Sequence, residues 1–151
     1  MRIVKIILMF LIIAFVGIQF VPTSRNISDT VPKTDFMEIN KVPNAIQNEL
    51  QVSCYDCHSN NTRYPWYNKV QPIAYFLERH IKEGKAELNF SEWEAYSNRR
   101  KNSKLRSIIS QIQDDEMPLY SYTLMHREAK FSEAEKISLI HYLTAFRDSL
   151  E

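Results

Sequence analysis

The sequence predicts an all-α fold, a small bundle of about five helices that follows an N-terminal transmembrane helix. Apolar residues recur at helical spacing in several stretches, of which 105–112 is the clearest. Ser-x-x-Glu patterns at 91–94 and 132–135 are typical of capping boxes, which mark helix starts. Runs that alternate between polar and apolar residues, as strands do, are essentially absent from the sequence.

The first 21 residues are the most apolar part of the chain. Arg2 and Lys5 precede a run over 6–21 that is interrupted by a single glutamine. Its length is intermediate between a signal-peptide core and a short spanning helix. Residues 19–22 are bulky and end in proline, which disfavours a cleavage site. We therefore expect 1–21 to be an uncleaved anchor in a bacterial inner membrane, with the rest of the chain on the periplasmic side; a cleaved signal segment is the alternative.

An extended linker is expected over residues 22–43. Pro22, Pro32 and Pro43 interrupt this stretch, and the residues between them include Ser, Thr, Asn and Asp. The remaining residues, 44–151, are enough for one domain and too few for two.

Five helices are expected within that domain. The first begins after Pro43 and reaches Cys54, and the second begins at Pro72 and ends near Gly84. The third and the fifth begin at the two capping boxes, and the fourth carries the 105–112 stripe. In the fifth helix, the apolar stripe is expected to comprise four residues: Ile137, Ile140, Leu143 and Phe146.

Composition excludes two classes of function. The chain has only two glycines, so it cannot form a glycine-rich phosphate loop or a dinucleotide-binding fingerprint. Seventeen of the 19 Lys and Arg residues follow the apolar run, and so do all 18 Asp and Glu residues, which gives this part a net charge of −1. Without a basic excess we expect no nucleic-acid partner.

Both cysteines lie in one short motif, Cys54-Tyr-Asp-Cys57-His58. This is the attachment pattern of c-type haem. Two thiols one helical turn apart can each add to one vinyl group of the same porphyrin, and the histidine that follows is placed under the iron as an axial ligand. We therefore expect one covalent haem c, held by Cys54 and Cys57, with His58 as the proximal iron ligand.

The two cysteines have three other interpretations. A redox-active disulfide needs a βαβ context, which the sequence lacks. A zinc site needs two more ligands at matched spacing, and His80 and His126 are not so arranged. A structural disulfide is the third.

Met117 is expected to be the distal iron ligand. It precedes Pro118, which favours an extended backbone at Met117 on a loop that can approach the iron opposite His58. His80 is the alternative, and an open or water-ligated site is a further one. A thioether ligand would raise the reduction potential, whereas a second imidazole would lower it.

The residues after the haem motif include possible partners for the haem propionates. Arg63, Trp66 and Tyr67 carry donor groups suited to a carboxylate. A basic run over 99–106 is a possible docking surface for an acidic redox partner. Ordinary packing, or a solvated helix face, is the plainer interpretation of both features.

The chain from about 44 to 149 resembles a family of bacterial haem-binding domains found in exported and anchored proteins. The resemblance rests on an ordered series of residues: Cys54-Tyr-Asp-Cys57-His58-Ser59, Trp66-Tyr67, Pro72, His80, Gly84, Leu88-Asn89-Phe90-Ser91-x-Trp93, Met117-Pro118-Leu-Tyr120, His126 and Phe131-Ser132-x-x-Glu135. It implies a monohaem c-type cytochrome-like module with an N-terminal membrane anchor, and it implies no substrate. The series includes both His80 and Met117, so it leaves the distal ligand open.

Two functions follow as expectations. The first is a membrane-anchored periplasmic cytochrome that exchanges single electrons with redox partner proteins, without catalytic residues. The second is a haem enzyme or gas-binding sensor with an open distal site, in which His80 or His126 would act as a distal base.

Overall fold

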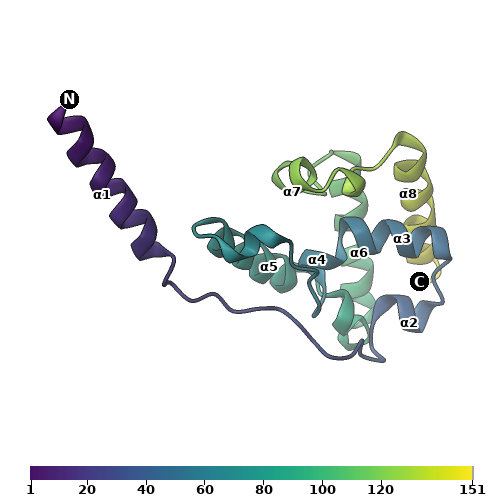
Figure 1. Ribbon diagram of the computed structural model, residues 1–151. Helices are drawn as coiled ribbons and strands as arrows, with labels where there is room; N and C mark the ends of the chain where they lie inside the picture. Colours follow the sequence, from purple (N-terminus) through teal and green to yellow (C-terminus); the bar gives the residue numbers. More distant parts are fainter. Residues whose placement is uncertain (151) are drawn as a thin grey trace.

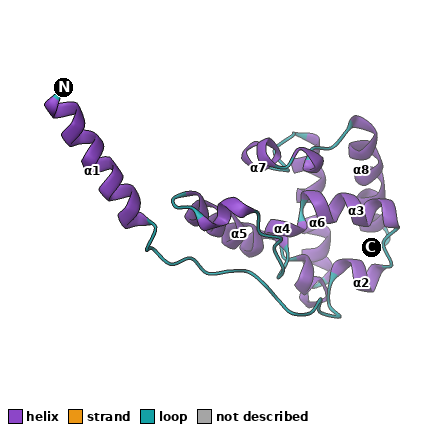
Figure 2. Cartoon of the chain, in the orientation of Figure 1, coloured by secondary structure: helices purple, strands orange, loops and turns teal. Residues whose placement is uncertain are grey.

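The structure, a computed structural model, describes residues 1–150, and every regular element within that range is a helix (Figure 2). The prediction of an all-α fold is therefore confirmed, but the predicted number of about five helices is wrong. The α-helices are α1 (Arg2–Ile18), α2 (Phe36–Asn40), α3 (Asn44–Ser53), α4 (Tyr55–His58), α5 (Ile73–Glu87), α6 (Asn98–Gln113), α7 (Tyr120–Met125) and α8 (Glu133–Asp148). Three short 3-10 helices complete the fold: η1 (Trp66–Lys69), η2 (Phe90–Ala95) and η3 (Arg127–Ala129). The predicted number is too low because short helices such as α2, α4 and α7 carry too few residues to show a helical apolar stripe.

The core lies where α3, α6 and α8 pack together, with α2 and η2 beside them (Figure 1). Leu105 and Ile109 of α6 face Leu139 and Leu143 of α8, and these side chains are buried because they recur at the helical spacing of three to four residues. The stripe expected for the last helix is partly wrong, because Ile137 is 66% exposed.

The N-terminal helix differs from the expected transmembrane helix. α1 has 17 residues, and none of its side chains is buried. It extends away from the helical body (Figure 1). No helix in residues 1–150 is long and apolar enough to cross a membrane, which typically takes about 20 apolar residues. The prediction of a transmembrane helix is therefore wrong.

The segment expected to be an extended linker contains α2. Asp35 caps this helix by accepting a hydrogen bond from the Met37 amide at 2.9 Å. The ring of Phe36 is completely buried, with centroid distances of 5.0 Å to Trp93 and 5.4 Å to Phe146. Pro32 and Pro43 leave room between them for this short helix, so the second half of the segment contributes to the core.

The first half of the segment is extended but attached. The side-chain amide of Asn26 donates to the Ser59 carbonyl at 2.8 Å and to the Thr62 hydroxyl at 2.9 Å. The Thr62 amide donates in return to the Asn26 carbonyl at 2.9 Å. These bonds fix the segment beside the residues that follow the Cys-x-x-Cys-His motif.

One of the two predicted capping boxes is present. Ser132 and Glu135 form it at the start of α8. At η2 the cap is Asn89 instead, whose side chain accepts from the Ser91 amide. Ser91 is buried, and its hydroxyl accepts from the Asn60 amide at 3.1 Å. The role of Ser91 therefore depends on its tertiary contact with Asn60, which the local Ser-x-x-Glu pattern does not reveal.

Candidate functional site

The Cys-x-x-Cys-His motif forms its own helical turn. Cys54 ends α3 and begins α4 with a backbone outside the helical region (φ −127°, ψ −43°). Its carbonyl accepts from the amides of Cys57 and His58 at 3.2 and 3.0 Å. The two cysteines are therefore one turn apart and are not joined by a disulfide.

The orientation and tautomer of His58 are fixed by Gly84 near the end of helix α5 and by Leu88, which follows that helix. The Nδ1 atom of His58 lies 2.9 Å from the Gly84 carbonyl oxygen and 3.1 Å from that of Leu88. Carbonyl oxygens only accept, so Nδ1 carries the ring proton and Nε2 keeps its lone pair. Burial lowers the pKa of His58, which favours the neutral ring. A neutral imidazole whose other nitrogen is hydrogen-bonded to the backbone is the usual form of a histidine metal ligand.

Gly84 allows α5 to approach this turn closely. A Cβ atom at position 84 would lie 3.0 Å from the Cys57 carbonyl oxygen and 3.3 Å from Cε1 of His58. The sequence predicts that this helix ends near Gly84, but α5 continues to Glu87, and its glycine has no positive φ. The glycine is required for the contact between α4 and α5 and not as a helix stop.

A cavity of about 450 Å³ opens beside α4. Three predicted site residues line it: Cys54 at the start of α4, His58 within α4, and Met117 in the loop after α6. Apolar side chains make up much of the remaining wall: Leu88, Phe90, Ile108, Ile112, Pro118 and Phe131. Cys57 is not among the lining residues and lies on the Gly84 side of the turn.

Met117 is positioned by the end of α6. Asp115 has a left-handed backbone (φ 56°), which reverses the chain after the helix. The amides of Glu116 and Met117 then both donate to the Gln111 carbonyl, at 2.9 and 3.1 Å. These bonds hold the methionine on the wall of the cavity.

The two histidines that the sequence suggested for the distal side of the haem lie elsewhere. His80 belongs to α5, the helix whose Gly84 carbonyl oxygen lies 2.9 Å from Nδ1 of His58, and it is not on the cavity wall. Nε2 of His126 is 2.8 Å from the Tyr67 hydroxyl, and its ring stacks on Tyr122 at 4.4 Å. Neither histidine lines the cavity.

The residues expected near the haem propionates also lie away from this cavity. The backbone amide of Arg63 donates to Asp56, and its guanidinium lies 3.6 Å from the same carboxylate. Trp66 is 75% exposed, and Tyr67 is bonded to His126. None of the three lines the cavity with His58, so the sequence-based assignment of Arg63, Trp66 and Tyr67 to this site is not supported by their positions.

Asp56 is a structural residue that the sequence did not single out. It is 7% exposed and accepts hydrogen bonds from the Arg63 amide at 3.1 Å and the Tyr122 hydroxyl at 2.8 Å. Burial and this bond raise the pKa of Tyr122. The carboxylate thus connects α4 to α7, and its position inside the motif gave no sign of burial.

The donor set fits a haem better than a zinc ion. An imidazole nitrogen, a thioether and a thiol share one largely apolar cavity of the size that cofactor sites have. Burial raises the pKa of Cys54 to about 12 and that of Cys57 to about 11. Within residues 1–150 no group of three or more His, Cys, Asp and Glu side chains could hold a metal ion.

Comparison with known proteins agrees with this donor set. No curated protein and no solved structure matches the chain. A model of a family described as a haem-binding domain matches residues 13–145, a range that includes Cys54, Cys57, His58 and Met117. Because the match covers most of its length, the chain belongs to the haem-binding domain family.

Proposed function

We propose that this haem-binding domain is a monohaem c-type cytochrome that transfers single electrons. The observation that carries the proposal is the shared cavity of Cys54, His58 and Met117, in which Nδ1 of His58 is already bonded to the backbone of α5. In this assignment His58 is the proximal iron ligand and Met117 the distal one.

Cys54 and Cys57 would hold the haem through two thioether bonds. Each thiol would add across one vinyl double bond, with sulfur joining one carbon and the thiol hydrogen the other, so no oxidant would be needed. The single turn of α4 gives the spacing that two vinyl groups of one porphyrin require. The match to the family supports haem binding, and the motif supports its covalent form.

The chain's own residues favour a carrier over a catalyst. A bound haem supplies a one-electron redox couple. The Gly84 carbonyl orients His58, the bonds to Gln111 hold Met117, and the wall of Phe90, Ile112 and Phe131 limits access of water. If His58 and Met117 both bound the iron, no open position would remain for a substrate, and the thioether would favour a raised potential.

We also propose that the domain works on the periplasmic side of a bacterial inner membrane with redox proteins as partners. Residues 2–18 are almost wholly apolar and exposed, and Arg2 and Lys5 lie at their start. Such a segment is suited to directing a chain to the membrane for export. Cell fractionation tests this proposal; protein found in the cytoplasm would contradict it.

The proposed function is tested by a pyridine haemochrome spectrum and a haem stain after denaturing electrophoresis. The full chain is expressed in a host with c-type maturation machinery, and Cys54→Ala/Cys57→Ala is the control. Haem that survives denaturation in the wild type and not in the control is the expected result. A wild type without haem would overturn the proposal, and ready binding of carbon monoxide by the reduced protein would favour the open-site alternative.

A further inference from the structure

Among the residues that the structure describes, Lys104 is the only lysine or arginine that lines the cavity. It projects from α6 and is half-buried. The same wall carries the thiol of Cys54 and the imidazole of His58. A cation is thus placed beside the group of side chains that would bind the haem.

Helix α6 presents two rows of side chains to the cavity. One row is polar throughout and consists of Ser103, Ser107 and Gln111. The other begins with Lys104 and continues with Ile108 and Ile112. Since Ser103 and Ser107 are exposed, this polar row marks the side on which the cavity meets solvent.

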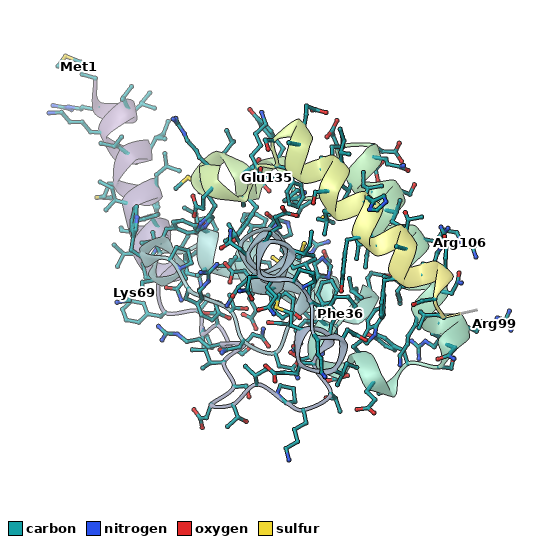
Figure 3. The ribbon with its side chains drawn as sticks, turned by 90° about the vertical axis from the view of Figure 1, so that its right-hand side faces the viewer. Met1, Phe36, Lys69, Arg99, Arg106 and Glu135 are labelled. Atoms are coloured by element: carbon teal, nitrogen blue, oxygen red, sulfur yellow. The ribbon has the colours of Figure 1, made fainter. Side chains whose placement is uncertain are left out.

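Lys104 has no anionic partner within residues 1–150, where it forms neither a hydrogen bond nor an ion pair. Glu87 is the other charged residue on the wall, and it is not bonded to Lys104. Elsewhere on α6, Arg100 lies over the ring of Tyr96 at 5.1 Å and Arg106 donates to Asn102 at 2.9 Å. Arg99 and Arg106 lie at the outer edge of the molecule (Figure 3).

A haem propionate would be a suitable anionic partner for Lys104. A haem is an apolar ring with two propionate carboxylates on one edge, so a site needs an apolar side and a polar, cationic side. Phe90, Ile112 and Phe131 provide the first side, and the polar row of α6 with Lys104 provides the second.

We infer that Lys104 binds a haem propionate, so that the propionate edge lies against the first half of α6. This inference rests on the proposed haem site. Arg63, which the sequence favoured for the same role, is engaged by Asp56 instead. The long lysine stem can cover the apolar wall while its ammonium group stays at the opening.

The test compares Lys104→Gln and Lys104→Arg with Lys101→Gln in the haem-loaded full chain. Lys101 is a matched control because it lies on the same helix, is also half-buried and does not line the cavity. Haem content is measured first, then the reduction potential is titrated against pH by absorption spectroscopy. Circular dichroism checks that all three variants fold.

Loss of Lys104 is expected to lower the potential and to raise the pKa of the propionate by about one unit, because a neighbouring cation stabilises a carboxylate. Lys104→Arg should restore both properties, and Lys101→Gln should change neither. The other titratable wall residues, Cys54, His58 and Glu87, are unaltered in all variants. Equal titration curves for Lys104→Gln and Lys101→Gln in a protein that retains haem would overturn this inference alone, whereas a wild type without haem would overturn it together with the proposed function.

Discussion

Nδ1 of His58 lies 2.9 Å from the carbonyl oxygen of Gly84, and this short distance depends on the absence of a side chain at position 84. The glycine lets α5 rest directly on the turn that carries Cys57 and His58. The orientation of the imidazole is therefore set by backbone packing between two helices.

Gly84→Ala should destabilise the protein and disturb His58. The new methyl group would lie 3.0 Å from a backbone oxygen, so α5 must move away from α4. Overpacking of this kind costs about 1–3 kcal/mol, and the gain in helix propensity of about 1 kcal/mol reduces the expected net loss to about 0–2 kcal/mol. Urea unfolding measures the change. Gly17→Ala is the matched control, because no atom lies within 4 Å of its new Cβ; equal stability of the two variants would contradict this account.

Met117→Ala should open the distal side of the bound haem. Since the methionine thioether is lost, the reduced protein should gain carbon monoxide binding and its reduction potential should fall. Absorption spectra with and without carbon monoxide measure the first effect, and a redox titration measures the second. His80→Ala should leave both unchanged because His80 does not line the cavity. If His80→Ala gave these changes and Met117→Ala did not, the ligand assignment would be wrong.

Phe36→Ala should cost about 3–5 kcal/mol of unfolding free energy, the usual range for a phenylalanine lost from a core. The reason is that Phe36 has no exposed surface and contacts aromatic rings on η2 and α8. Chemical denaturation of the haem-loaded protein provides the measurement. Phe76→Ala is the control, since that side chain is 52% exposed, and it should change stability by about 0.5 kcal/mol or less. Equal effects would show that 35–42 is no part of the core.

Ser132→Ala should cost about 1 kcal/mol through loss of the helix cap on α8. The Ser132 amide and hydroxyl each donate to the Glu135 carboxylate at 2.7 Å, and these bonds lower the pKa of Glu135. A carboxyl group with a lowered pKa stabilises the fold above its ordinary pKa of 4.5 and loses this effect as the pH falls through the lower, folded value. The difference between wild type and variant should therefore shrink in acid.

Thermal unfolding at several pH values tests this dependence. Ser138→Ala, at an exposed position in the middle of the same helix, is the control and should show no such trend. A difference that grows as the pH falls would contradict the assigned sign.

Local patterns predicted most of the helices, but not which face of each helix is buried. The last helix carries apolar residues around a wide arc, so the pattern alone gave Ile137 to the core where the structure buries Leu139 instead. α2 was missed because Pro32 and Pro43 suggested an extended chain, and the burial of Phe36 depends on rings that lie far away in the sequence.

The candidate site likewise has residues that the sequence predicts and residues that only the packing of helices reveals. Cys54, Cys57 and His58 form a contiguous motif with a chemical reason for its spacing, so the sequence was sufficient to propose them. Lys104 reaches the cavity only through the packing of α6, and Arg63 is drawn away by a buried Asp56. Neither relationship has a local signal, since both depend on which elements meet in space.

The contact between Phe36 and Phe146 also has a consequence for the order of events during biogenesis. The two rings come from opposite ends of the domain, and the Cys54–His58 turn lies between them in the sequence. A chain that has emerged only as far as this turn lacks α8, so its core cannot close around the cysteines. If a haem is attached covalently, as we propose, an enzyme acting at that stage would meet accessible thiols on an incomplete chain, and α8 would then close the core over them.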